Sequence, residues 1–331
     1  MKERIPTIDT ARGIAIILVV IGHSISYADE PINTFILSFH MPLFFVISGM
    51  TVKLQPPRTN FLEYVIHKSK RLLLPQVFLG FILYMYYGLL VLYQTGEMTL
   101  FEPLNLIKRI IEPWFLIVMF QITIVSYVYR RWIISSKSMS IVFNLLILSL
   151  CFFMVISNFS TKYGYVHIVP VGWVFYIIGL HGRQYLLAPL AGKREYMIIL
   201  SLAMVFCLSQ INTPVKMYTA DYGIFPLFLI TSLLGSISII RLCQRVSSPL
   251  LTKAGVYSMI IYVFQFPCTM LFFVVSTILC NRFELDNESL RIGLNILLAL
   301  PLLSILTIYS IRNRIMRYIF GLATQNNKGN L

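Results

Sequence analysis

Apolar stretches of about 20 residues recur along the whole chain, and this feature limits the possible folds more than any other. Roughly 20 helical residues cross the hydrocarbon core of a bilayer, where a helix satisfies its own backbone polar groups. The predicted spans are 13–29, 33–52, 72–94, 113–129, 139–158, 167–182, 196–212, 223–240, 254–279 and 292–311. The pattern predicts an all-α fold, a polytopic transmembrane helix bundle of about ten spans that forms one integral membrane domain over residues 1–331.

The charge content agrees with a membrane protein. Charged residues make up 12% of the chain, against about 25% in soluble domains, and the mean hydropathy is +0.78. No polar stretch is long enough to surround the core of a soluble domain. A second apolar run follows the first almost at once, so we expect the first run to be retained rather than cleaved as a signal peptide.

The basic residues are distributed unequally between the two predicted sides of the membrane. Of the 27 Lys and Arg residues, 21 fall in the termini and the even-numbered loops, and 6 fall in the other loops. Because cytoplasmic loops are enriched in Lys and Arg, both termini are predicted to be cytoplasmic. Topology therefore explains the net charge of +14, and no nucleic-acid partner is expected.

Several function classes lack their usual signals. The five cysteines are scattered without a CxxC pair, so we expect neither a metal site nor a disulfide. No nucleotide-binding or zinc-protease motif is present, and no internal repeat supports an inverted-repeat transporter. The segment 104–112, "LNLIKRIIE", is too short to span and is predicted to be a helix in the outer interface.

The first span carries two polar residues that need an explanation. Arg12 and His23 are eleven residues apart, which on a helix is three turns and about 16 Å along one face. An ionisable group inside the membrane is a functional candidate by default. The alternative is a histidine that bonds a neighbouring helix, together with an arginine that snorkels to the headgroups and marks topology.

The next span begins with a similar pattern, "SFHMPLFFVISGM" at residues 38–50. His40 is a candidate to contact a substrate or to orient His23, and a core histidine is the alternative. Ser48 and Gly49 are small residues that permit close helix packing. Because no G-x-S-x-G elbow surrounds Ser48, packing is favoured over a serine nucleophile.

A basic cluster and a tryptophan complete the set of candidates. "HKSKRLLLP" at residues 67–75 places Lys68, Lys70 and Arg71 at the cytoplasmic start of the third span. These cations suit a phosphate site, or they anchor topology and bind anionic lipids. Trp114 suits stacking on a sugar ring, or it belongs to the aromatic belt of the interface.

Taken together, four stretches resemble the acyltransferase-3 family of integral membrane acyltransferases, and within it the fucose 4-O-acetylase-like branch. They are "IDTARGIAIILVVIGHS", "SFHMPLFFVISG", "KSKRLLLP" and "PWFLIVMF", with looser likeness at "GWVFYIIGL" and "AGVYSMIIYVFQFP". The family's paired Arg and His match Arg12 and His23, its FFxxSG matches 44–49, and its basic element matches 68–71. One departure is Gln265, which stands where members of the family often have a histidine.

The resemblance implies transfer of an acyl group, usually acetyl from cytosolic acetyl-CoA, to a sugar hydroxyl of a cell-envelope glycan or lipid-linked sugar. It implies a multi-pass protein of the bacterial inner (cytoplasmic) membrane that uses acetyl-CoA as co-substrate and no metal. Arg12 and His23 would be the catalytic pair, with His23 as general base or acyl carrier and Arg12 also near the donor's phosphates. Lys68, Lys70 and Arg71 would bind the donor, and His40, Ser48 and Trp114 would contact the acceptor. The acceptor sugar and the oligomeric state are left open.

Two other functions fit a polytopic bundle with buried polar residues. One is a transporter or flippase for a lipid-linked sugar, which the missing repeat and the single intramembrane titratable cluster disfavour. The other is a membrane scaffold whose polar residues only join helices. Acetyl-CoA turnover by the purified protein separates the enzyme from both.

Overall fold

The computed structural model describes residues 5–25, 30–96, 103–161, 164–189, 195–246, 248–284 and 288–322. These residues are almost entirely helical, as predicted, and no named strand occurs among them. Every predicted span contains a helix. Within the described ranges, eight helices or joined helices are long and apolar enough to cross a membrane, which confirms an all-α polytopic bundle.

The chain divides into two compact units, each built from separated parts of the sequence. Unit 1 contains residues 1–61 and 118–258, and unit 2 contains residues 62–117 and 259–331. Both ends of the chain, which are predicted to be cytoplasmic, lie outside the described residues. Their side of the membrane therefore stays a prediction.

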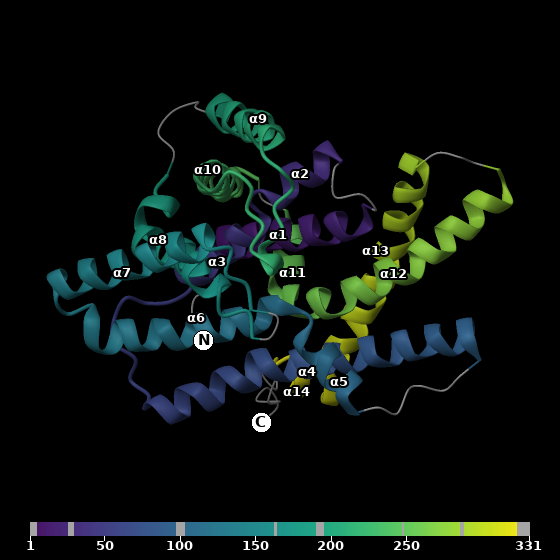
Figure 1. Ribbon diagram of the computed structural model, residues 1–331, viewed down its shortest axis with the longest axis horizontal. Coiled ribbons are helices and arrows are strands. Elements are labelled where there is room, and N and C mark those ends of the chain that lie inside the picture. The colour runs from purple at the N-terminus through teal and green to yellow at the C-terminus, as the bar shows by residue number, and fades with distance from the viewer. Residues whose placement is uncertain are drawn as a thin grey trace, which may run out of the picture. The chain divides into compact units, whose positions relative to one another are not determined.

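Unit 1 is organised around the buried helix α3, His40–Met50 (Figure 1). Its helices, in chain order, are α1 Pro6–Ser24, α2 Pro31–Leu37, α3 His40–Met50, the later part of α6 Trp114–Val128, the π-helical turn η2 Tyr129–Ile133, α7 Lys137–Ile156, α8 Ile168–Leu187, α9 Glu195–Ile211, the 3-10 turn η3 Met217–Thr219, α10 Phe225–Leu242 and α11 Pro249–Val256. Helix α3 contacts α1, α8 and α10. Ten of its eleven residues are buried.

The predicted span 33–52 is interrupted by a short break between α2 and α3. Pro42 has no N–H, so the carbonyl of Ser38 lacks its usual helical donor. The hydroxyl of Ser232 in α10 donates to that carbonyl at 2.6 Å. A neighbouring helix therefore satisfies the backbone group that the proline frees, as membrane helices require.

Helix α8 packs on α3 through a reciprocal pair of glycines. A Cβ atom on Gly49 would lie 2.1 Å from the carbonyl oxygen of Tyr176, and one on Gly179 would lie 2.0 Å from that of Val46. Both distances are far inside van der Waals contact. Only glycine permits this approach of the two backbones, as at other small-residue membrane interfaces.

Helices α8 and α9 are not among the eight long apolar helices, because α9 has 17 residues and α8 is less apolar. Both nevertheless lie along α10. Glu195 at the start of α9 is 3.9 Å from Arg245, beyond the end of α10, and Ser201 and Ser238 share a 2.8 Å hydrogen bond. Arg241 donates to the carbonyls of Tyr185 and Ala188 at the end of α8. The two helices therefore run beside a spanning helix, in agreement with about ten spans.

Unit 2 contains α4 Phe61–Thr95 from Leu62 onward, α5 Pro103–Ile111, the first turn of α6, α12 Ser258–Arg282 from Met259 onward, α13 Glu288–Arg312 and α14 Arg314–Ile319. The predicted interfacial segment 104–112 is the amphipathic helix α5. Gln76 of α4 donates to the carbonyls of Ile110 and Pro113 at 2.6 and 2.7 Å, which fixes the end of α5 against α4.

Candidate functional site

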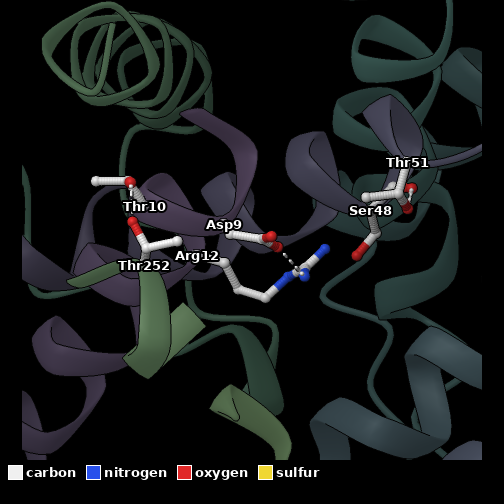
Figure 2. Close-up of polar contacts among 6 residues, drawn as sticks. All are labelled: Asp9, Thr10, Arg12, Ser48, Thr51 and Thr252. Atoms are coloured by element: carbon white, nitrogen blue, oxygen red, sulfur yellow. Dashed lines mark hydrogen bonds and ion pairs between the residues drawn. The ribbon is translucent and has the colours of Figure 1, made fainter. Parts of the chain in front are cut away.

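Arg12 lies in the second turn of α1 and is held by an acid on the same helix. Its Nη1 is 3.2 Å from Oδ1 of Asp9, and both side chains are largely buried, with 25% and 12% of their areas exposed. Figure 2 shows the Arg12 side chain extending from α1 toward Ser48 of α3. The pairing fixes the direction of the guanidinium, because Asp9 and Arg12 stand one turn apart on the same helix.

Helix α11 holds the backbone of α1 at this level. A Cβ atom on Gly13 would lie 2.0 Å from the carbonyl oxygen of Leu251, and one on Gly255 would lie 1.7 Å from that of Asp9. The hydroxyls of Thr10 and Thr252 are 2.9 Å apart (Figure 2). Arg12 is therefore presented by a rigid two-helix contact.

His23 lies at the other end of α1, next to its last residue. It is exposed, whereas His40, the first residue of α3, is only 8% exposed. The two imidazoles are close enough for their charges to interact. The structure therefore places the two histidines, which the sequence put on successive spans, within electrostatic range of each other.

The hydrogen bond of His40 determines its neutral tautomer. Nδ1 lies 2.8 Å from the carbonyl oxygen of Ile36, and a carbonyl can only accept, so Nδ1 carries the proton. In the neutral imidazole Nε2 then has a lone pair and no proton. His40 can accept a proton or a hydrogen bond at Nε2. Its ring is held by the hydrogen bond from Nδ1 to Ile36, across the break between α2 and α3.

Arg12 and His23 of α1, and Ser48 and His40 of α3, are polar residues on two contacting helices; we call these four residues the polar ladder. Ser48 itself is half-buried, its carbonyl accepts from the hydroxyl of Thr51 at 2.7 Å, and its neighbour Gly49 packs on α8. Ser48 therefore occupies a close-packed position, and its side chain still faces the guanidinium side of α1.

The predicted donor residues Lys68, Lys70 and Arg71 lie in the first three turns of α4, in unit 2. Lys70 and Arg71 are exposed, and the Lys68 ammonium lies 5.3 Å from the centre of the Tyr64 ring. The structure gathers these cations on one helix. The polar ladder belongs to unit 1.

Trp114 is the first residue of α6 and also belongs to unit 2. It is half-buried and meets the Phe115 ring edge to face at 5.9 Å, and Phe115 in turn contacts Tyr262 at 5.6 Å. The tryptophan is part of an aromatic cluster, a position compatible with either predicted role.

The sequence analysis missed several residues that shape the site. Asp9 could have been found, since an acid three residues before an arginine at a helix start predicts an ion pair. Thr252 and Gly255 carry no such signal, because their role depends on how α11 packs. Gln265, which the sequence analysis did single out, lies in α12 of unit 2; it is 3% exposed, and its Oε1 has no hydrogen-bond partner among the described residues.

Comparison with known protein families gives a match over most of the chain. A family model described as an acyltransferase domain, that of the acyltransferase-3 family, matches residues 5–311. No curated protein and no solved structure matches the chain. The match covers both units and every residue of the polar ladder, and the helices have the length and composition of membrane spans. The chain therefore belongs to the acyltransferase-3 family and is a multi-pass membrane acyltransferase.

Proposed function

We propose that the protein transfers an acetyl group from cytosolic acetyl-CoA to a sugar hydroxyl of a cell-envelope glycan, such as an O-antigen, capsule or other exopolysaccharide unit. The observation that carries this proposal is the polar ladder. It combines a cation at one level of the α1–α3 contact with a pair of histidines at another level. About 16 Å of helix separates Arg12 from His23, a distance that a pantetheine arm can bridge.

Two routes fit the histidine pair. In the first, neutral His23 removes the proton of the sugar hydroxyl as its oxygen attacks the thioester. The new O–C bond replaces the C–S bond, and the proton passes to the thiolate that leaves. General-base catalysis of this kind contributes about 10²–10⁴-fold. In the second, a nitrogen of His23 attacks the thioester, the C–S bond breaks, and the thiolate leaves with the imidazole proton. The sugar hydroxyl then attacks the acetyl-imidazole, the N–C bond breaks, and the hydroxyl proton returns to the imidazole. In both, His40 orients His23 or the acceptor through Nε2.

The donor's phosphates require cations on the cytosolic side. Lys68, Lys70 and Arg71 supply positive charge at the start of α4, and Arg12 carries a guanidinium that suits a bidentate contact. Trp114 and Ser48 are proposed to contact the acceptor. None of these roles needs a metal.

We predict that Arg71→Ala raises KM for acetyl-CoA about tenfold with little change in kcat, because a charge-assisted phosphate contact is lost. Added salt should weaken donor binding more in the wild type than in the variant. Arg282→Ala is the matched control, since Arg282 is an exposed cation at the other predicted face of unit 2. Equal KM values for Arg71→Ala and wild type would remove Arg71 from the donor site.

We also predict the inner-membrane topology from the distribution of basic residues. Reporter fusions within 95–103 should lie outside the cytoplasm, and fusions within 183–195 should lie inside it. Fusions within 183–195 also distinguish a topology of ten spans from one of eight. If α8 and α9 did not cross the membrane, residues 183–195 would be external.

The decisive experiment follows acetyl transfer directly. Purified protein in detergent is incubated with labelled acetyl-CoA and a lipid-linked or free glycan acceptor, and labelled glycan is measured. In cells, mass spectrometry of the envelope glycans should show loss of acetyl groups when the gene is deleted. A transporter or flippase would leave acetyl-CoA unconsumed in the purified system, and that result would reject the proposal.

A further inference from the structure

Arg130 is a buried cation in unit 1 that the polar ladder does not use. It is 6% exposed and lies in the π-helical turn η2 that follows α6. Its Nε donates to the carbonyl and the hydroxyl of Ser126 at 3.3 Å, and its Nη1 donates to the carbonyls of Lys53 and Gln55 at 3.3 and 3.4 Å. All four acceptors are neutral.

No carboxylate of the described residues forms an ion pair with Arg130. An arginine stays protonated in proteins, and a buried charge without a counter-ion is costly. Four long contacts to neutral oxygens satisfy Nε and Nη1, but they supply no negative charge.

The guanidinium also has donors to spare. Within the described part of the chain, Nη2 makes no hydrogen bond, and it is not a fully enclosed atom. Four exposed cations lie on the segment that follows α3 and on the segment from η2 to the start of α7. None of them is in an ion pair with a described acid. They are Lys53, Arg58, Arg131 and Lys137. The local field is therefore positive and attracts anions.

The location links Arg130 to the polar ladder within unit 1. Lys53 and Gln55 follow α3 by three and five residues, so Arg130 binds the segment that leaves the Ser48 end of α3. Ser126 accepts from the hydroxyl of Tyr176 at 2.9 Å, and Tyr176 is the residue against which Gly49 packs. Departures from regular α-helix such as η2 are frequent at functional sites.

We propose that Arg130 binds a phosphate group of the nucleotide end of the acyl donor through Nη2. The inference rests on the proposed function, since acetyl-CoA supplies the phosphate. A planar guanidinium held at Nε and Nη1 is preorganised to grip phosphate oxygens. A phosphate bound here compensates the positive charge of Arg130. The thioester end of the donor then extends along the polar ladder.

The test compares two donors and two variants in nanodiscs of purely zwitterionic lipid. Arg130→Gln keeps hydrogen-bond donors for the carbonyls and removes the charge. Its kcat/KM for acetyl-CoA should fall about 10-fold to 100-fold, the loss typical of a charged hydrogen bond. Its kcat/KM for acetyl-pantetheine, which has no phosphate, should equal that of the wild type. Arg131→Gln, which neutralises the adjacent exposed cation, should change either value less than about twofold.

The outcomes separate the possible roles. A structural role for Arg130 predicts equal losses with both donors and would overturn the proposal. An effect that appears only when anionic lipid is added identifies a lipid headgroup as the ligand and would also overturn it. If Arg130→Gln does not accumulate, Arg130→Lys should show the same donor dependence with a smaller loss, and equal losses with both donors would again reject the proposal.

The same experiment distinguishes this inference from the proposed function. If the wild type consumes acetyl-CoA and Arg130→Gln has an unchanged donor ratio, only the Arg130 site is wrong. If the wild type neither binds nor consumes acetyl-CoA, the proposed function itself fails.

Discussion

Two segments of unit 1 have the same length and opposite surroundings. Pro31–Met50 and Lys137–Ile156 each have 20 residues, with mean hydropathies of 1.5 and 2.6. In the first, 78% of the apolar window is buried, against 6% in the second. The less apolar segment forms the centre of the unit, and the more apolar one leaves Leu145 and Leu146 exposed on its surface, as a helix that faces lipid would. Lipid tails are as apolar as leucine, so packing in a membrane favours small and polar residues.

The comparison predicts where substitutions have consequences. Changes in the α1–α3 region should affect chemistry or close packing. Changes on the outer face of α7 should affect neither, although they remove more hydrophobic surface. If the effect of a substitution followed the hydrophobicity of its span, changes in α7 would have larger effects than changes in the α1–α3 region.

The largest expected effect is at His23. His23→Ala should abolish glycan acetylation, a loss of at least about 10²-fold, while the protein still inserts. His23→Gln should also be inactive, because glutamine can replace a hydrogen bond but cannot accept the hydroxyl proton or carry an acyl group. The measurement is acetyl content of the glycan per amount of membrane protein, with Leu146→Ala on α7 as an active control. An active His23→Gln enzyme would make His23 structural and would refute both catalytic routes.

The next effect concerns the contact between α3 and α8. Gly179→Ala adds one methyl group 2.0 Å from the carbonyl oxygen of Val46, so the helices must separate. We expect a loss of about 1–3 kcal/mol in stability, measured as a lower Tm in detergent, together with lower activity.

Gly182→Ala is the matched control on the same helix. A Cβ atom there would contact only the Leu186 side chain at 3.6 Å. This variant should be neutral or slightly stabilising, because alanine favours a helix more than glycine does. Equal Tm values for the two variants would show that the α3–α8 contact is looser than described.

Much of the α3–α7 contrast was outside the reach of sequence analysis. Apolar length predicted the helices, because bilayer thickness fixes it. It did not predict the break at Ser38, which depends on a hydroxyl donated by Ser232 from nearly two hundred residues away. The division into two units was also unpredictable, since both units are assembled from distant parts of the chain.

The candidate site was predicted in part. Arg12, His23 and His40 were found because ionisable groups are rare in membrane spans, and the structure adds the proximity of the two histidines. Arg130 was counted only as a marker of topology. Its burial follows from the fold of the loop after α3 around η2, and one sequence does not reveal that contact.

The smallest expected effect tests one of the polar contacts that tie α7 to the buried side of unit 1, where Ser140 and Asn144 also contact the Tyr129 hydroxyl. Oδ1 of Asn144 accepts from Nε1 of Trp173 at 3.0 Å, and Trp173 is 1% exposed. Asn144→Leu makes α7 more apolar and leaves the indole N–H buried without its acceptor. We expect stability to fall by about 1 kcal/mol, and Trp173→Phe in the Asn144→Leu background should cost less than it does in the wild type.

Interhelical hydrogen bonds in membranes are worth about 0.6 kcal/mol on average, so a double-mutant cycle on detergent Tm values should give a coupling near that size. A coupling of zero would mean that the Asn144–Trp173 hydrogen bond does not help to attach α7. The polar attachment of α7 would then rest on the contacts of Ser140 and Asn144 with the Tyr129 hydroxyl, and its contrast with α3 would be sharper.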